Sequence, residues 1–127
     1  VRTGLPYLGW SAGANLATPS LGTTNDMPIA EPPSFRCLNL VPYQINPHFT
    51  HRVIPCHGGE SRIDRLNEYT AVHPEQAVLA LPEGSGIRVT AFRHRLVGKK
   101  SAYLFRHHHS EPLNPPESSD FLSIIQA

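Results

Sequence analysis

The feature that most restricts the fold of this 127-residue chain is a Gly-x-Ser-x-Gly pentapeptide at residues 9–13. The apolar residues 5–10 predict a short buried strand, and the alanine-rich residues 11–17 predict the first turns of a helix that Pro19 ends. Glycines on both sides of a serine let a strand turn sharply into a helix without Cβ clashes. We therefore expect a strand–turn–helix unit with Ser11 at the bend.

Apolar runs and helix breakers along the rest of the chain predict alternating strands and helices. We expect a long loop without regular structure, a turn and a helix at residues 18–36, 55–59 and 60–73, and strands at residues 37–45, 77–81, 87–92, 95–97 and 102–105. This alternation is typical of an α/β sheet. The chain opens directly on a strand that should be central, so we expect a sheet that lacks its N-terminal half.

Composition excludes several classes of partner. A net charge of +1 gives no concentrated basic face for nucleic acid or an anionic membrane. No apolar run approaches the roughly 20 residues that span a bilayer, and no secretory signal is recognisable. Cys37 and Cys56 have no nearby partner in the sequence, so we expect free thiols in a reducing, cytoplasmic compartment. No cofactor is predicted.

Three reactive side chains fall at the ends of predicted strands. A serine nucleophile needs a base, and His48 follows the strand at 37–45. Glu83 follows the strand at 77–81, and the carboxyl ends of parallel strands meet at one edge of a sheet. Ser11, His48 and Glu83 are thus predicted to act as nucleophile, base and orienting carboxylate, with the Ala12 N–H as the first oxyanion donor.

Several uncommon strings resemble the peptidase E family, which is serine peptidase family S51. They are GWSAGANLA (9–17), TTNDMPI (23–29), LNLVPYQINPHFT (38–50), GESR (59–62) and ALPEGSGIRV (80–89). The likeness covers about residues 4–106. Residues 1–106 are therefore interpreted as the C-terminal part of the family's catalytic domain, and residues 107–127 as a divergent tail.

The resemblance implies a mostly parallel sheet with flanking helices, similar to class I glutamine amidotransferases, and a further half-sheet upstream. It also implies hydrolysis of Asp-X dipeptides through an acyl-enzyme, with Ser11 as nucleophile and His48 as base. The third member of the triad falls on Glu83 or on Asp26. We favour Glu83, because a carboxylate at a strand end is better held than one in a proline-rich loop, and Asp26 would then meet the substrate's amino group.

The resemblance also indicates how an aspartyl side chain would be bound. A guanidinium fork binds a carboxylate better than a lysine does, and Arg62 matches the family's arginine. Glu60 belongs to the same helix start and is included in the predicted substrate site.

Other interpretations remain open from the residues alone. His48, His51, His57 and the run at 107–109 suggest a metal site, but adjacent residues in a strand point to opposite faces, so no metal is predicted. A truncated and weak or inactive paralogue would act through a second copy or a partner chain that completes the sheet. A cyanophycinase-like hydrolase would share the Ser11 turn.

Overall fold

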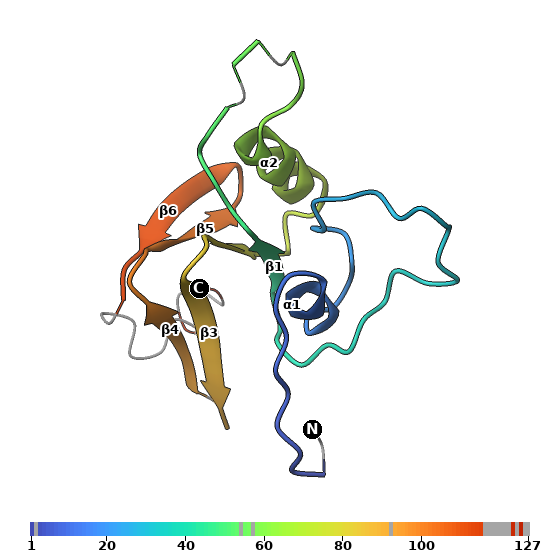
Figure 1. Cartoon of the computed structure of the whole chain (residues 1–127), viewed down its shortest axis with the longest axis vertical. Coiled ribbons are helices and arrows are strands. Elements are labelled where there is room, and N and C mark those ends of the chain that lie inside the picture. The colour runs from blue at the N-terminus through green and yellow to red at the C-terminus, as the bar shows by residue number, and fades with distance from the viewer. Residues whose placement is uncertain are drawn as a thin grey trace.

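The computed structural model describes residues 1, 3–53, 55–56, 58–91, 93–115, 123 and 125. The described chain forms a four-stranded sheet in the order β1-β2-β5-β6 and a separate two-stranded sheet, β3-β4 (Figure 1). The elements are α1 (Ala12–Leu16), β1 (Gln44–Pro47), α2 (Arg62–Val72), β2 (Val78–Leu81), β3 (Ser85–Thr90), β4 (Arg93–Gly98), β5 (Ala102–Arg106) and β6 (His109–Leu113).

The larger sheet is mixed. β1 and β2 are parallel, whereas β2–β5 and β5–β6 are antiparallel. A helix, α2, links the parallel pair, as parallel strands require, while the β3-β4 hairpin separates β2 from β5 and the chain returns in the opposite direction. The expectation of an α/β fold is confirmed, but among the described strands parallel pairing is the minority arrangement.

The two faces of the larger sheet carry separate apolar clusters, because side chains alternate along each strand. On the face that α2 covers, Val78, Ala80 and Phe105 pack with Phe49 and Leu66. The opposite face is covered by α1 and the β3-β4 hairpin. Its cluster includes residues from both sheets and from the segment before β1, namely Val41, Tyr43, Ile45, Ala77, Leu79, Leu81, Leu96, Ala102, Leu104 and Leu113.

Helix α2 begins with a capping box. The Ser61 side chain accepts a hydrogen bond from the Asp64 N–H, and the Asp64 carboxylate accepts one from the Ser61 N–H. These two bonds satisfy N–H groups that have no partner within the helix. Leu66 and Thr70 are buried along one side of the helix. The helix predicted at residues 60–73 is thus confirmed, with slightly narrower bounds.

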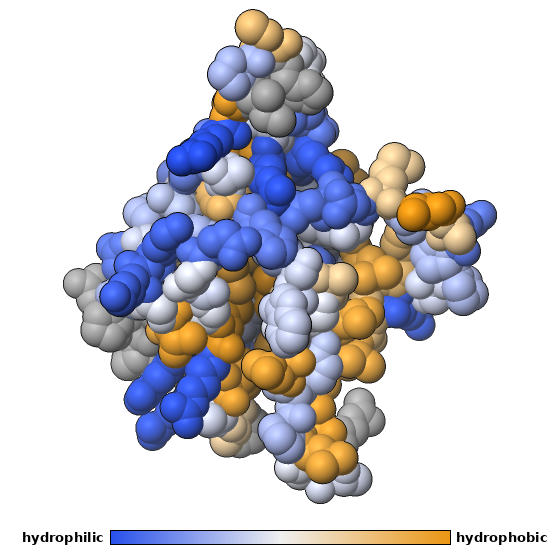
Figure 2. Space-filling view, in the orientation of Figure 1, coloured by the Kyte–Doolittle hydropathy of each residue, from blue (hydrophilic) through white to orange (hydrophobic). Residues whose placement is uncertain are grey.

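The prediction of a buried strand at residues 5–10 is wrong. This segment forms no strand, and the exposed fractions of Leu5, Leu8 and Trp10 are 71%, 86% and 77%. Figures 1 and 2 show it extending away from the sheet with apolar side chains on its surface. A strand forms only where a neighbour shares its ladder of hydrogen bonds, and none of the described strands is hydrogen-bonded to this segment.

The strand predicted at residues 37–45 begins later than expected. β1 starts only at Gln44, because the preceding backbone bonds to the last residue of α1 and to the segment that follows it. Leu38 N donates to Leu16 O (3.0 Å) and Leu40 N donates to Ala17 O (2.8 Å). The loop predicted at residues 18–36 is confirmed, apart from an isolated bridge between Ser20 and Arg36.

The later strands agree better with the sequence, except for β6. β2, β3, β4 and β5 correspond to predicted strands. β6 was not predicted, and it pairs with β5 through a tight turn at His107 and His108, whose φ values are 49° and 60°. Positive φ at both positions is typical of a type I′ turn, which the sequence did not reveal because Asn-Gly or Asp-Gly is its usual signal.

The domain division at residue 106 stays a prediction. Within the described part of the chain, no helix is long and apolar enough to cross a membrane.

Candidate active site

The bend at Ser11 has the backbone expected of a sharp strand-to-helix turn. Ser11 adopts φ 54° and ψ −125°, a conformation that a residue with a Cβ rarely occupies. A Cβ on Gly9 would lie 2.5 Å from the Gly13 carbonyl oxygen, so only glycine fits there. A Cβ on Gly13 would meet nothing within 4 Å. The tight approach in the motif therefore depends on its first glycine.

Two hydrogen bonds fix the short helix that follows Ser11. Tyr7 donates its hydroxyl proton to Gly13 O (2.7 Å), and the buried Asn15 donates from Nδ2 to Ile45 O in β1 (2.8 Å). The second bond ties α1 to the first strand of the larger sheet. It therefore sets the position of Ser11 relative to β1.

His48 and Glu83 meet at the carboxyl ends of two neighbouring parallel strands. His48 follows β1 directly, and Glu83 lies two residues beyond β2. His48 Nδ1 is hydrogen-bonded to Glu83 Oε1, and both side chains remain partly exposed. The pair of strand-end residues that the sequence suggested thus lies in direct contact.

Ser11, His48 and Glu83 all line one hollow of about 740 Å³. Apolar residues of the N-terminal segment and of β3 form much of its remaining wall, including Leu8, Trp10, Ile87 and Val89. Among the described residues, the His48 side chain is hydrogen-bonded to Glu83 and not to Ser11. The hollow therefore contains a serine, an imidazole and a carboxylate around one apolar space.

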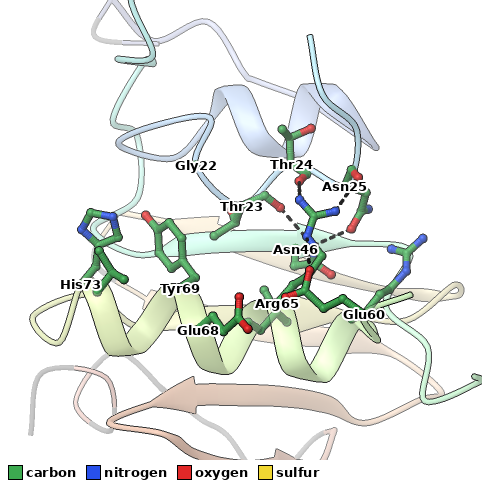
Figure 3. A pocket seen from close by; sticks show the side chains of 13 residues that line it. Gly22, Thr23, Thr24, Asn25, Asn46, Glu60, Arg65, Glu68, Tyr69 and His73 are labelled. Carbon is green, nitrogen blue, oxygen red and sulfur yellow. Dashed lines mark hydrogen bonds and ion pairs between the residues drawn. The ribbon is translucent and has the colours of Figure 1, made fainter. Parts of the chain in front are cut away.

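A second, smaller hollow of about 290 Å³ lies between α2 and the loop at residues 22–25 (Figure 3). Glu60 and Arg62, predicted in the substrate site, line this hollow and not the one that contains Ser11. Asp26 lines neither hollow and is exposed. The sequence-based site is therefore divided between two places.

Arg62 nevertheless reaches the backbone beside the imidazole. Its Nη1 donates to Pro47 O (3.2 Å), the carbonyl immediately before His48. Arg65, one turn further along α2, lies with Nε 3.7 Å from Glu60 Oε2. The smaller hollow thus borders the residues that hold the end of β1.

Two carboxylates at the start of α2 titrate differently. A hydrogen bond with Glu68, together with the charge of that residue, raises the pKa of Glu60 above its usual value, although Arg65 acts in the opposite direction. Hydrogen bonds from Ser61 lower the pKa of Asp64. Near the N-terminal end of α2, one carboxyl group therefore has a raised pKa and another has a lowered pKa.

Two asparagines at the site were missed from the sequence. Asn25 Nδ2 donates to Pro47 O (2.8 Å), and Asn46 Nδ2 donates to Asn25 Oδ1 (2.7 Å). Each adjoins a motif position that the sequence did single out, since Asn25 precedes Asp26 and Asn46 precedes the Pro47-His48 pair. That adjacency was the available signal, but a role in holding a backbone carbonyl has no sequence pattern of its own.

Within the part of the chain that the structure describes, no group of three or more histidine, cysteine or acidic side chains could hold a metal ion. His57, one of the histidines considered for such a site, lies outside the described residues.

Cys37 and Cys56 are free, as predicted, and partial burial raises the pKa of the Cys37 thiol.

Comparison with known proteins gives a consistent result. The family described as Peptidase family S51 matches residues 1–97. A Nostoc protein named Peptidase E is 48% identical over 123 residues, which are 96% of this chain and 51% of that protein. Proteins of the same name from Shewanella denitrificans and Haemophilus influenzae are 51% and 50% identical over 105 and 106 residues, covering 83% and 84% of this chain and 45% and 49% of theirs. The chain spans about half the length of the curated relatives it matches.

Proposed function

This chain belongs to Peptidase family S51, and from that premise we propose that it carries the catalytic residues of a serine-type dipeptidase that hydrolyses Asp-X dipeptides. The contact between His48 and Glu83, on the wall of the hollow that Ser11 also lines, is the observation that supports this most strongly. A serine alone is a weak nucleophile, and a base oriented by a third group activates it.

In the proposed reaction, His48 Nε2 takes the proton of Ser11 Oγ as Oγ attacks the carbonyl carbon of the substrate's aspartyl residue. The C–N bond then breaks, and the imidazolium returns the proton to the departing amine. Water hydrolyses the resulting ester by the same steps and releases aspartate. Glu83 accepts a hydrogen bond from Nδ1, which fixes the ring and stabilises its charged form.

The Ala12 backbone N–H is proposed as a donor to the oxyanion. It follows the nucleophile directly, and the positive φ of Ser11 turns the chain sharply at this point. Removing one such donor in other serine hydrolases costs about 10²–10³ in rate. The wider arrangement that we propose is that of class I glutamine amidotransferases, with this chain supplying the part of the sheet that carries Ser11, His48 and Glu83.

Arg62 is proposed to bind the substrate's side-chain carboxylate, with Glu60 beside it and Asp26 near the substrate's amino group. Arg62 Nη1 bonds to the carbonyl before His48, which brings the guanidinium to the backbone of the base. Asp26 is the weaker of the two candidates for the third triad position, because it does not line the hollow of Ser11, whereas Glu83 lines it and bonds to His48.

A second candidate function is pairing with another chain, either a second copy or a different partner that completes the sheet. The exposed apolar side chains of Leu5, Leu8 and Trp10 favour it, because such surface is normally covered in a monomer. An active peptidase completed in this way would work in the cytoplasm, in keeping with its free cysteines. Sedimentation of the purified chain distinguishes a complex from a monomer.

The test is release of free aspartate from Asp-Leu by the purified chain. We expect Ser11→Ala to reduce the rate by a factor on the order of 10⁶, to the background level. Asn-Leu, which has the same shape without the carboxylate, is the matched control substrate, and Arg62→Lys should narrow the preference for Asp-Leu over Asn-Leu. A folded wild-type chain without activity, alone or as an assembled complex, would refute the proposal.

A further inference from the structure

We propose that Asn25 is a positioning residue that holds His48 in its working conformation by fixing the carbonyl group that precedes it. This inference rests on the proposed function, in which His48 is the base. Asn25 touches neither the imidazole nor Ser11 in the described contacts, so its effect passes through the backbone of β1.

His48 needs such support because its backbone is strained. Its φ is 56°, in the left-handed region that residues other than glycine seldom occupy. This conformation is unfavourable and persists only where the surrounding structure holds it. Because the imidazole is attached to this strained backbone, a change of φ at His48 would move the ring away from Glu83.

The peptide group that follows His48 is anchored by the sheet. Phe49 N donates to Leu81 O (3.0 Å), the last residue of β2. The Phe49 side chain is 3% exposed and packs against Phe105. This anchor fixes one of the two peptide groups that flank His48.

The peptide group before His48 is anchored by side chains instead of by a strand. Pro47 O accepts hydrogen bonds from Asn25 Nδ2 (2.8 Å) and from Arg62 Nη1 (3.2 Å). The Asn25 bond is the shorter one. With the Phe49 bond on the other side, His48 is held at both flanking peptide groups.

The orientation of the Asn25 amide is fixed by its own partners. Its Oδ1 accepts from Asn46 Nδ2 (2.7 Å), and its backbone carbonyl accepts from Arg65 Nη1 (2.9 Å) (Figure 3). Asn46 Nδ2 also donates to Thr23 O (3.0 Å). Because Pro47 O can only accept, residue 25 must present a donor to it and an acceptor to Asn46. Asparagine meets both demands, whereas aspartate would place an acceptor against the carbonyl.

The experiment uses NMR spectroscopy of the purified 127-residue chain, with Asn25→Ala, Asn25→Asp and the loop control Thr24→Ala. Thr24 contributes its backbone carbonyl to Arg65 (3.5 Å), which alanine keeps. The readout is the downfield resonance of the proton on His48 Nδ1 that bonds to Glu83. This resonance is assigned by its disappearance in Glu83→Gln. We expect both Asn25 variants to lose or broaden this resonance and Thr24→Ala to retain it.

The same variants are then assayed on Asp-Leu. Misplacement of a catalytic group by about 1 Å can cost up to about 10²-fold, so kcat should fall by that order with KM unchanged. Asn25→Asp keeps the size of the side chain, and it decides the matter if Asn25→Ala fails to fold. Loss of the His48 resonance in folded Asn25 variants supports the inference even if the wild-type chain releases no aspartate. An unchanged resonance in those variants overturns it.

Discussion

The two faces of the larger sheet are closed in different ways at the end of β1. On the face of α2, the helix and the loop at residues 22–25 enclose a small hollow of about 290 Å³ that is lined mainly by polar and charged residues and crossed by side-chain hydrogen bonds. On the opposite face, an apolar hollow of about 740 Å³ opens beside exposed side chains of the N-terminal segment. His48 follows directly from the strand between them. In the proposed function, the face of α2 therefore positions the base His48, while the opposite face carries the nucleophile Ser11 and leaves space for a ligand.

The largest effect expected from this contrast is on stability. Phe105 is fully buried on the α2 face, so Phe105→Ala should lower the free energy of unfolding by about 3–5 kcal/mol. Leu8 is 86% exposed, so Leu8→Ala should change it by no more than about 0.5 kcal/mol. Urea unfolding measures both. A comparable cost for Leu8→Ala would mean that another chain covers the N-terminal segment in solution.

An intermediate effect should distinguish the two glycines of the Ser11 bend. A Cβ at Gly9 would collide with a backbone oxygen that cannot move aside cheaply, so Gly9→Ala should cost about 1–3 kcal/mol. Gly13 lies inside α1 with open space around its missing Cβ, so Gly13→Ala should stabilise the chain by about 0.5–1 kcal/mol. Thermal unfolding of the two variants provides the comparison. Equal destabilisation would show that the space around Gly13 is closed in solution.

The smallest effect concerns the cap of α2 and its dependence on pH. Hydrogen bonds from Ser61 lower the pKa of Asp64 in the folded chain, so ionised Asp64 stabilises the fold. That stabilisation is fully present above the ordinary aspartate pKa of about 3.9 and is lost as the pH falls through the lower folded value. Unfolding midpoints of wild type and Asp64→Asn should therefore differ at pH 7 and converge at low pH.

A double-mutant comparison tests whether Ser61 and Asp64 stabilise the helix through the same hydrogen bonds. Ser61→Ala removes the hydroxyl group that bonds Asp64, so Asp64→Asn should have a smaller effect in that background than in the wild type. The same effect in both backgrounds would contradict a role for the capping box.

The sequence revealed the elements whose signals are local. The turn at Ser11, the helix after Ser61 and the apolar strand β2 could each be read from short patterns, and the strand-end positions of His48 and Glu83 followed from them. Elements that depend on distant partners could not be read in this way. Residues 5–10 have the composition of a strand but no neighbour in the described sheet, and β6 exists because β5 lies beside it.

The candidate site shows the same limit. The contact of His48 with Glu83 was expected, since parallel strands bring their carboxyl ends together. The separation of Arg62 from the hollow of Ser11 was not expected, because the sequence does not show on which face of the sheet each side chain lies. Asn25 was missed for a related reason, since its partner Pro47 is 22 residues away in sequence.

Covalent labelling by a fluorophosphonate, read out by peptide mass spectrometry, tests whether Ser11, His48 and Glu83 act together. We predict modification of Ser11 in the wild-type chain, loss of labelling in His48→Ala and strong slowing in Glu83→Gln, with Asp26→Asn close to wild type. Absence of label on Ser11 in the folded chain, or slowing by Asp26→Asn as great as by Glu83→Gln, would show that these three residues do not form the proposed triad.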